Sequence, residues 1–332
     1  MTQNTSNSAP FIEASRYDQF ILTNLHDGML PDNMTRDVSN FGTGTTLNVK
    51  SVGTVTLQDA AEGSPLVYNA IDTGNVTLGI TKYTGDAWSV SDELKQDGDQ
   101  IDSLQAARAQ ESTRALQESF ETEFLIQCNA AQALNTTNLV NGFAHRIIGS
   151  SDTRVMIEED LIAMGLAFDK ANVPAAGRIG IVDPVTAAAF NLQVTLTSSN
   201  QLLNGSNFYN EWSNSFVENH RFVARIHGWD LFTSNRLPTI AAVTSSTVKQ
   251  GDGSAMNAVV GDVANIFMSI VDDNTKPMMR AWRKMPSTEG WRSPEDREDR
   301  FQVTARYGIG PQRVDTLGVI LTSPTSTNTA VA

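Results

Sequence analysis

The chain has 332 residues, enough for two hydrophobic cores or for one elongated subunit whose parts pack separately. Its single cysteine, Cys128, excludes an intrachain disulfide, and its four histidines do not have the spacing of metal ligands. A net charge of -13 opposes attraction to nucleic-acid phosphates, and no run approaches the roughly 20 apolar residues of a membrane-spanning helix, so neither a DNA-binding module nor a membrane protein is predicted.

An extended arm is predicted at the N-terminus. Residues 1–16 are rich in Asn, Thr and Ser, and the chain then passes Gly28, Pro31, Gly42 and Gly44. Glycine and proline interrupt helices and strands, so this composition favours an extended segment.

A large two-stranded flap is predicted next. Residues 45–59 and 74–90 each alternate apolar and polar side chains, which is typical of half-buried strands. The connection between them contains glycine and proline and is too long for a tight turn. A flap of this kind has little core of its own, so we expect it to lie on a neighbour.

A long helix is predicted from Ile101, in a segment whose periodicity changes near Ser91. Good helix formers dominate it, and neither proline nor glycine interrupts it before Gly142. We expect about 30 helical residues with a narrow apolar stripe, so that the helix crosses a surface and is not buried. The stripe comprises Leu104, Leu116, Phe120, Phe124 and Leu134.

The remaining sequence predicts mixed α+β structure. A loop is expected after the long helix, followed by a second helix in 157–172 with Leu161, Met164 and either Leu166 or Phe168 in a core. Pro174 and Gly177 end that helix. The later elements, in order, are a buried strand in 178–184, a helix in 186–193, a polar loop in 201–212, a strand–turn–strand unit around Gly228, mixed strand and helix in 257–273, and two strands in 300–323.

This order of parts, and several phrases within it, resembles the Hong Kong 97-type major capsid proteins of tailed double-stranded DNA bacteriophages. The phrases are WSVSDELKQD at 88–97, DLIAMGLAFDKANVPAAGRIGIVDPVTAAAF at 160–190, HGWDLFTSNRLP at 227–238 and RFQVTARYGIGPQRVDTLGVILTS at 300–323. In that family, the first phrase corresponds to the junction between the returning strand of the extended loop and the spine helix. The resemblance covers roughly residues 45–322.

The resemblance implies an α+β fold with an N-terminal arm, a two-stranded extended loop, a long spine helix, a peripheral domain and an axial domain. The implied boundaries are 1–44 for the arm, 45–90 for the extended loop, 91–155 for the spine helix and the first part of the peripheral domain, 156–270 for the axial domain, 271–312 for the return through the peripheral domain, and 313–332 for the final axial strand and tail. Gly98, before the spine helix, is either a flexure point or a simple helix-start turn.

The implied function is that of a structural subunit that self-assembles as hexamers and pentamers into an icosahedral head around packaged double-stranded DNA. The implied partners are further copies of the chain, a separate scaffolding protein, a portal protein and a cement or decoration protein, with no sequence-specific DNA binding and no membrane. The chain is then expected in the virion capsid after assembly in the host cytoplasm. Alternatives are an encapsulin-like compartment shell, another virion lattice protein such as a tail tube, or an enzyme.

No catalytic constellation is visible in the sequence. The acidic pairs Glu158-Glu159 and Asp272-Asp273 could act as acid and base or hold a divalent cation, but solvated surface or helix-dipole roles are favoured. No nucleophile elbow, zinc-protease or phosphate-binding-loop motif is present. We therefore predict no enzyme, no cofactor and no metal.

Candidate inter-subunit contacts lie in two places. On the flap they are Lys82, Tyr83 and Trp88, where the aromatic residues either anchor the flap to the next subunit or pack on their own helix. Some relatives crosslink through a lysine on the extended loop, but without a visible partner Lys82 is interpreted as a polar flap residue. In 291–301, Trp291, Arg292, Arg297 and Arg300 alternate with acids, as either a solvated loop or a set of inter-subunit salt bridges.

Overall fold

The computed structural model describes residues 32–40, 44–53, 57–59, 62–63, 68, 70–71, 73–97, 101–133, 139–151, 153–189, 222–240, 249–250 and 259–325. The helices are α1 (Asp92–Asp97), α2 (Ile101–Ala133) and α3 (Glu158–Lys170), with short 3-10 turns at Asp32–Met34 and Val314–Thr316 and a helical stretch at 184–189. The strands are β1 (Arg36–Asp37), β2 (Thr46–Val52), β3 (Thr73–Gly79), β4 (Lys82–Ser91), β5 (Leu139–Val140), β6 (Phe143–Ala144), β7 (Arg146–Ile148), β8 (Arg178–Val182), β9 (Phe222–Ile226), β10 (Trp229–Thr233), β11 (Lys249–Gln250), β12 (Val263–Ser269), β13 (Met278–Ser293), β14 (Glu298–Pro311) and β15 (Leu317–Thr322). No helix in the described part of the chain is long and apolar enough to cross a membrane.

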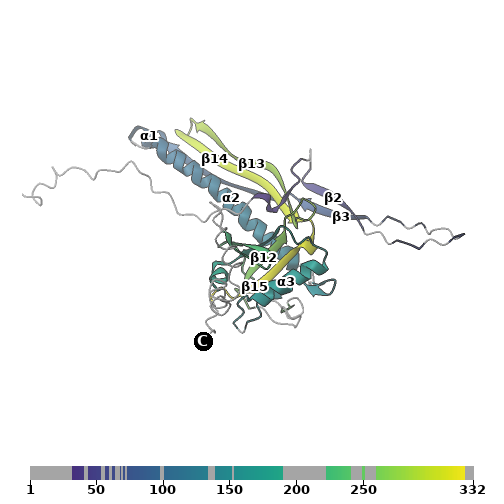
Figure 1. Ribbon diagram of the computed structural model, residues 1–332. Coiled ribbons are helices and arrows are strands. Elements are labelled where there is room, and N and C mark those ends of the chain that lie inside the picture. Colours follow the sequence, from purple (N-terminus) through teal and green to yellow (C-terminus); the bar gives the residue numbers. More distant parts are fainter. Residues whose placement is uncertain are drawn as a thin grey trace, which may run out of the picture.

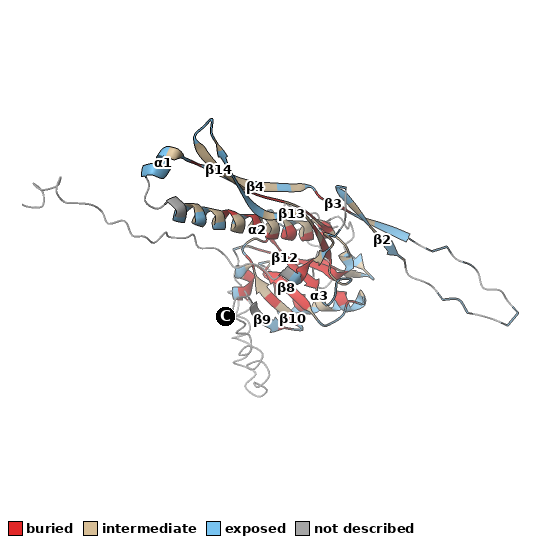
Figure 2. Cartoon of the chain, turned by 90° about the horizontal axis from the view of Figure 1, so that it is seen from above, coloured by how far each residue is buried: buried red, intermediate tan, exposed pale blue. Residues whose placement is uncertain are grey.

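A seven-stranded mixed sheet forms the main body. Its strand order is β11-β7-β15-β12-β8-β10-β9, and every described residue of β8, β12 and β15 is buried. Strands buried on both faces read as continuous apolar runs, as these do. Figure 2 shows that the buried residues concentrate in this body.

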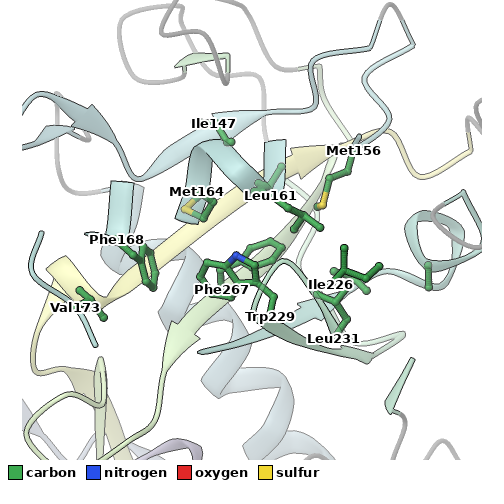
Figure 3. Close-up of a cluster of buried hydrophobic side chains, with 13 residues drawn as sticks. Ile147, Met156, Leu161, Met164, Phe168, Val173, Ile226, Trp229, Leu231 and Phe267 are labelled. Atoms are coloured by element: carbon green, nitrogen blue, oxygen red, sulfur yellow. The ribbon is translucent and has the colours of Figure 1, made fainter. Parts of the chain in front are cut away.

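Helix α3 covers one face of the seven-stranded sheet. Its buried side chains Leu161, Met164 and Phe168 recur at helical spacing and meet Trp229 and Phe267 from the sheet, as Figure 3 shows. Phe168 and Trp229 pack edge to face with centroids 5.1 Å apart. This core fixes α3 on the sheet.

A four-stranded sheet forms the second layer, with the order β1-β13-β14-β4. The N-terminal half of α2 lies along one face of it (Figures 1 and 2). Phe120 of α2 stacks on Trp282 at 4.8 Å and meets Tyr307 at 5.1 Å, beside buried Leu116. The C-terminal half of α2 instead packs Leu125, Cys128 and Ala131 against the seven-stranded sheet. One helix therefore joins both sheets.

The strands β2 and β3 form a separate two-stranded antiparallel ribbon, from Thr46 paired with Gly79 to Val52 paired with Thr73. It projects from the end of the four-stranded sheet (Figure 1).

Several predictions from the sequence are confirmed. The long helix begins at Ile101, the second helix is α3 with Phe168 and not Leu166 in the core, and 178–182 is a buried strand. The turn at Gly228 joins β9 to β10, with φ values of 48° at His227 and 80° at Gly228 that suit a primed hairpin turn. The two closing strands are β14 and β15.

Other predictions are wrong. The single returning strand predicted for 74–90 is two strands, because the chain leaves the ribbon after Gly79 and β4 joins the other sheet. The expectation that the long helix is not buried holds at Leu104, which is 56% exposed, but fails at Phe124, because the second sheet covers that half. The predicted loop after the helix contains β7, which lies inside the seven-stranded sheet.

Candidate assembly surface

The ribbon exposes apolar side chains far from any core. Val52, Leu57, Tyr68 and Ile71 are 73%, 91%, 99% and 77% exposed. Exposed apolar groups gathered on one projecting element mark an interaction site more often than a free surface. Tyr68 and Ile71 were not among the predicted contact residues, although the apolar letters in LVYNAI, within an otherwise loop-like connection, could have indicated them.

The base of the ribbon is anchored to its own chain. Leu78 and Ile80 are buried against Met279 and Ala281 of β13, and the Arg283 guanidinium donates to the carbonyl oxygen of Gly44 over 2.6 Å. Here β3 crosses β14 so closely that a Cβ added at Gly308 would overlap the carbonyl oxygen of Gly79 and lie 2.9 Å from Ile80 Cα. The base is therefore positioned by contact with backbone as well as side chains.

The β13–β14 hairpin tip and α1 lie at the opposite end of the molecule from the ribbon (Figures 1 and 2). Arg292 pairs with Asp92 at 2.7 Å, Lys95 pairs with Asp299, and the amide of Asp92 donates to Arg297 O over 2.9 Å. The hydrogen bonds from Lys95 and the nearby Arg292 charge lower the pKa of the Asp299 carboxyl despite its desolvation. These ion pairs fasten α1 to the hairpin.

The predicted arginines at this tip are thus placed in a hairpin and not in a loop. Arg300 contacts Asp296 and Glu298, each at 2.5 Å, which raises the pKa of its guanidinium. Arg297 occupies the turn with φ of 54°, and Trp291 is 46% exposed. The printed partners of Arg292 and Arg300 belong to the same chain, so an inter-subunit role for these side chains stays a prediction.

The three residues assigned to the flap lie on β4, outside the ribbon. Lys82 pairs with Glu123 of α2 at 3.0 Å, so its predicted position on the flap is wrong, because the chain changes sheets between Gly79 and Lys82. Trp88 stacks on Phe301 at 5.7 Å within the core beneath α2, the second of its two predicted arrangements. Tyr83, on the other face of β4, is 66% exposed.

The acidic pairs have structural roles. Glu158 lies in the first turn of α3 and contacts the His227 ring over 2.5 Å, while Asp272 accepts from the amides of Asn274 and Thr275 in a turn. Within the described ranges, no group of three or more His, Cys, Asp or Glu side chains is arranged to hold a metal ion. The candidate flexure residue Gly98 lies outside the described residues.

Comparison with known proteins gives likeness in structure only. No family model and no curated protein sequence matches the chain. A chain from a structure titled as the capsid of cyanophage P-SCSP1u has a TM-score of 0.68 at 14% identity, covering 97% of this chain and 96% of that one. A chain from the mature capsid of bacteriophage PhiM1 has a TM-score of 0.65 at 15% identity (93% and 92% covered), and one from Mycobacterium phage Che8 has 0.61 at 18% identity (93% and 97% covered). The predicted α+β fold of the Hong Kong 97 type is therefore confirmed.

Proposed function

We propose that this chain is a structural subunit of an icosahedral shell, assembling as hexamers and pentamers around the double-stranded DNA of a tailed phage. The observation that carries the proposal is the projecting ribbon with Val52, Leu57, Tyr68 and Ile71 exposed, on a fold shared over more than nine tenths of the chain with subunits from phage capsids. Apolar groups held this far from their own core gain stability only from another molecule.

The arrangement suits repeated contact between identical copies. The ribbon and the hairpin tip lie at opposite ends, so a contact of the ribbon of one copy with another copy joins two different surfaces. Head-to-tail contacts of this kind close into rings when the rotation between copies is right. The domain limits implied by the resemblance, with the axial domain near ring centres, belong to this proposal.

A structural and non-catalytic role is part of the proposal. So are a separate scaffolding protein, a portal protein, a cement protein, and assembly in the host cytoplasm before the chain resides in the virion. The net charge of -13 supports a shell that encloses DNA without gripping it. The predicted inter-subunit role of Tyr83 and Trp291, both exposed, is kept as a proposal.

The test is electron microscopy of the purified chain, expressed alone and with its candidate scaffolding protein. Closed particles or stable rings of five and six are expected. The variant with Tyr68→Ser and Ile71→Ser removes apolar surface from the ribbon and is expected to reduce the yield of closed particles at least tenfold, about 1.4 kcal/mol per contact or more.

The matched control is Tyr68→Phe with Ile71→Leu, which keeps the apolar area and is expected to assemble like the unchanged chain. Circular dichroism and thermal unfolding must agree among all three chains, since the substituted side chains lie outside every core. A compact monomer under both expression conditions would contradict the proposal, and closed particles from the serine variant would show that the ribbon is not the contact.

A further inference from the structure

The middle of α2 is the only part of that helix held by both sheets at once among the described contacts. Leu116 and Phe120 pack on the four-stranded sheet, and Glu123 pairs with Lys82 of β4 at 3.0 Å. Glu118 and Glu121, which lie on a different stripe of the helix, face Arg236. Any change in the angle between the sheets must therefore be accommodated here.

Arg236 makes a forked contact with α2. Its Nη2 lies 2.9 Å from Glu118 Oε1, and its Nη1 lies 3.1 Å from Glu121 Oε2. The side chains of Arg236 and Glu121 are only 12% and 7% exposed. Ser234 Oγ also donates to Glu121 Oε1 over 3.4 Å. Charge-assisted bonds from a rigid guanidinium fork define direction as well as distance.

The loop that carries Arg236 is fixed to the seven-stranded sheet. The Ser234 amide donates to Val182 O over 3.1 Å, the Ala264 amide donates to Pro238 O over 3.0 Å, and Thr239 forms a bridge with Val263. Arg236 thus transmits the orientation of that sheet to α2.

The other contacts between α2 and the seven-stranded sheet are mainly apolar. Leu125, Cys128 and Ala131 pack against residues such as Ile266 and Leu317. Burial of apolar surface is non-directional, so these contacts hold the helix on the sheet without setting its angle strictly. Near the helix end, Gln132 donates to Val314 O over 3.1 Å, which provides a pivot more than a lever.

We propose that Arg236, Glu118 and Glu121 form a releasable latch that sets the angle between the two sheets. When the latch opens, the four-stranded sheet, its ribbon and the N-terminal half of α2 pivot together on the apolar contacts around Cys128. Because the ribbon is anchored to the same sheet, a change of this angle redirects the proposed assembly surface. The latch itself is a property of the single chain and holds whether or not the chain forms a shell.

The test is a distance measurement between the two sheets by electron spin resonance. Ser89→Cys on β4 and Ile162→Cys on α3 place spin labels at exposed sites on the two parts, and Cys128 is fully buried. Labelled chain is diluted with excess unlabelled chain, so only distances within one molecule are recorded. The unchanged latch is expected to give one narrow distance distribution.

Arg236→Met is expected to at least double the width of that distribution or to displace its maximum, and the pair Glu118→Gln with Glu121→Gln is expected to do the same with less loss of stability, because glutamine keeps the shape and the hydrogen-bonding oxygen. The control Arg108→Met breaks an ion pair of α2 with Asp86, 2.8 Å long, that involves the four-stranded sheet alone. It is expected to leave the distribution unchanged.

Unchanged distributions in the glutamine variant would overturn the latch, even if the methionine variant does not fold. Equal broadening in Arg108→Met would also overturn it, because any weakened ion pair of α2 would then have the same effect. Particle formation is scored separately, so failure of the shell proposal leaves this result readable.

Discussion

His145 is a fully buried histidine between α3 and β15. Its ring stacks on Phe168 with centroids 5.4 Å apart, and its Nδ1 lies 3.2 Å from Leu317 O, to which it donates. Desolvation lowers the pKa of His145 below its ordinary value, although the bond to Leu317 and the charge of Asp315 act in the opposite direction. The neutral ring is therefore the form that fits the core.

This lowered pKa predicts loss of stability in mild acid. The unfolded chain binds the proton more readily than the folded chain, so stability is complete above the unfolded pKa of about 6.5 and falls as the pH drops below it. The measurement is urea unfolding of the unassembled subunit between about pH 8 and about pH 5.5. His145→Gln is expected to be less stable by roughly 1–3 kcal/mol at neutral pH but to show a shallower decline in acid. Parallel curves over the whole range would contradict the assignment.

The sequence predicted the residues of the candidate surface unevenly. Trp88 and Tyr83 were correctly recognised as neighbours on one strand, but their opposite environments follow from which face of β4 meets α2, and alternation alone leaves the choice of face open. Arg292 and Arg300 were recognised as a charged cluster, yet their partners could not be assigned, because Asp92 is 200 residues away in sequence from Arg292.

At the scale of elements, the crossing of β3 over β14 determines where the ribbon points. Gly308→Ala places a methyl group against the Gly79 carbonyl and 2.9 Å from Ile80 Cα, both backbone groups that cannot rotate away. We expect the substitution to displace the ribbon base, to cost about 1–3 kcal/mol, and to reduce the yield of closed particles. The unfolding midpoint and particle yield are the measurements.

A matched glycine provides the control for that prediction. A Cβ at Gly165 in α3 has the Trp229 Nε1 atom as its nearest neighbour at 3.8 Å, an ordinary contact. Gly165→Ala is therefore expected to be neutral or more stable by about 0.5–1 kcal/mol, since alanine favours the helix. Loss of assembly in the Gly165 variant, or normal assembly in the Gly308 variant, would show that the crossing is not what positions the ribbon.

Elements with a regular apolar period were predicted from the sequence, and those without one were missed. α3 and β8 have continuous patterns and were located within a few residues. β13 spans 16 residues but was missed, because its outer half is exposed, contains Pro286 and shifts register twice against β14. β7 has three residues, too few to show a period, and its burial comes from strands distant in sequence.

The whole molecule combines a large negative charge with a proposed need to contact itself. Each subunit carries a net charge of -13, so copies repel one another at low ionic strength. The ion pairs at the hairpin tip, such as Arg292 with Asp92, lie within one chain and do not offset that repulsion. The exposed ribbon residues are apolar, and salt does not weaken their contacts.

These two facts predict that salt promotes assembly. Raising the ionic strength from about 10 mM to about 150 mM shortens the screening length from roughly 30 Å to roughly 8 Å, which removes most of the repulsion between subunits while leaving apolar contacts intact. Light scattering by purified subunits should therefore rise faster, and reach a higher plateau, at the higher salt concentration. A lower plateau would mean that ion pairs between subunits outweigh both effects. Arg297 would then be the first side chain to replace, because it occupies the exposed turn of the hairpin and has a charge of the sign that an acidic neighbour would bind.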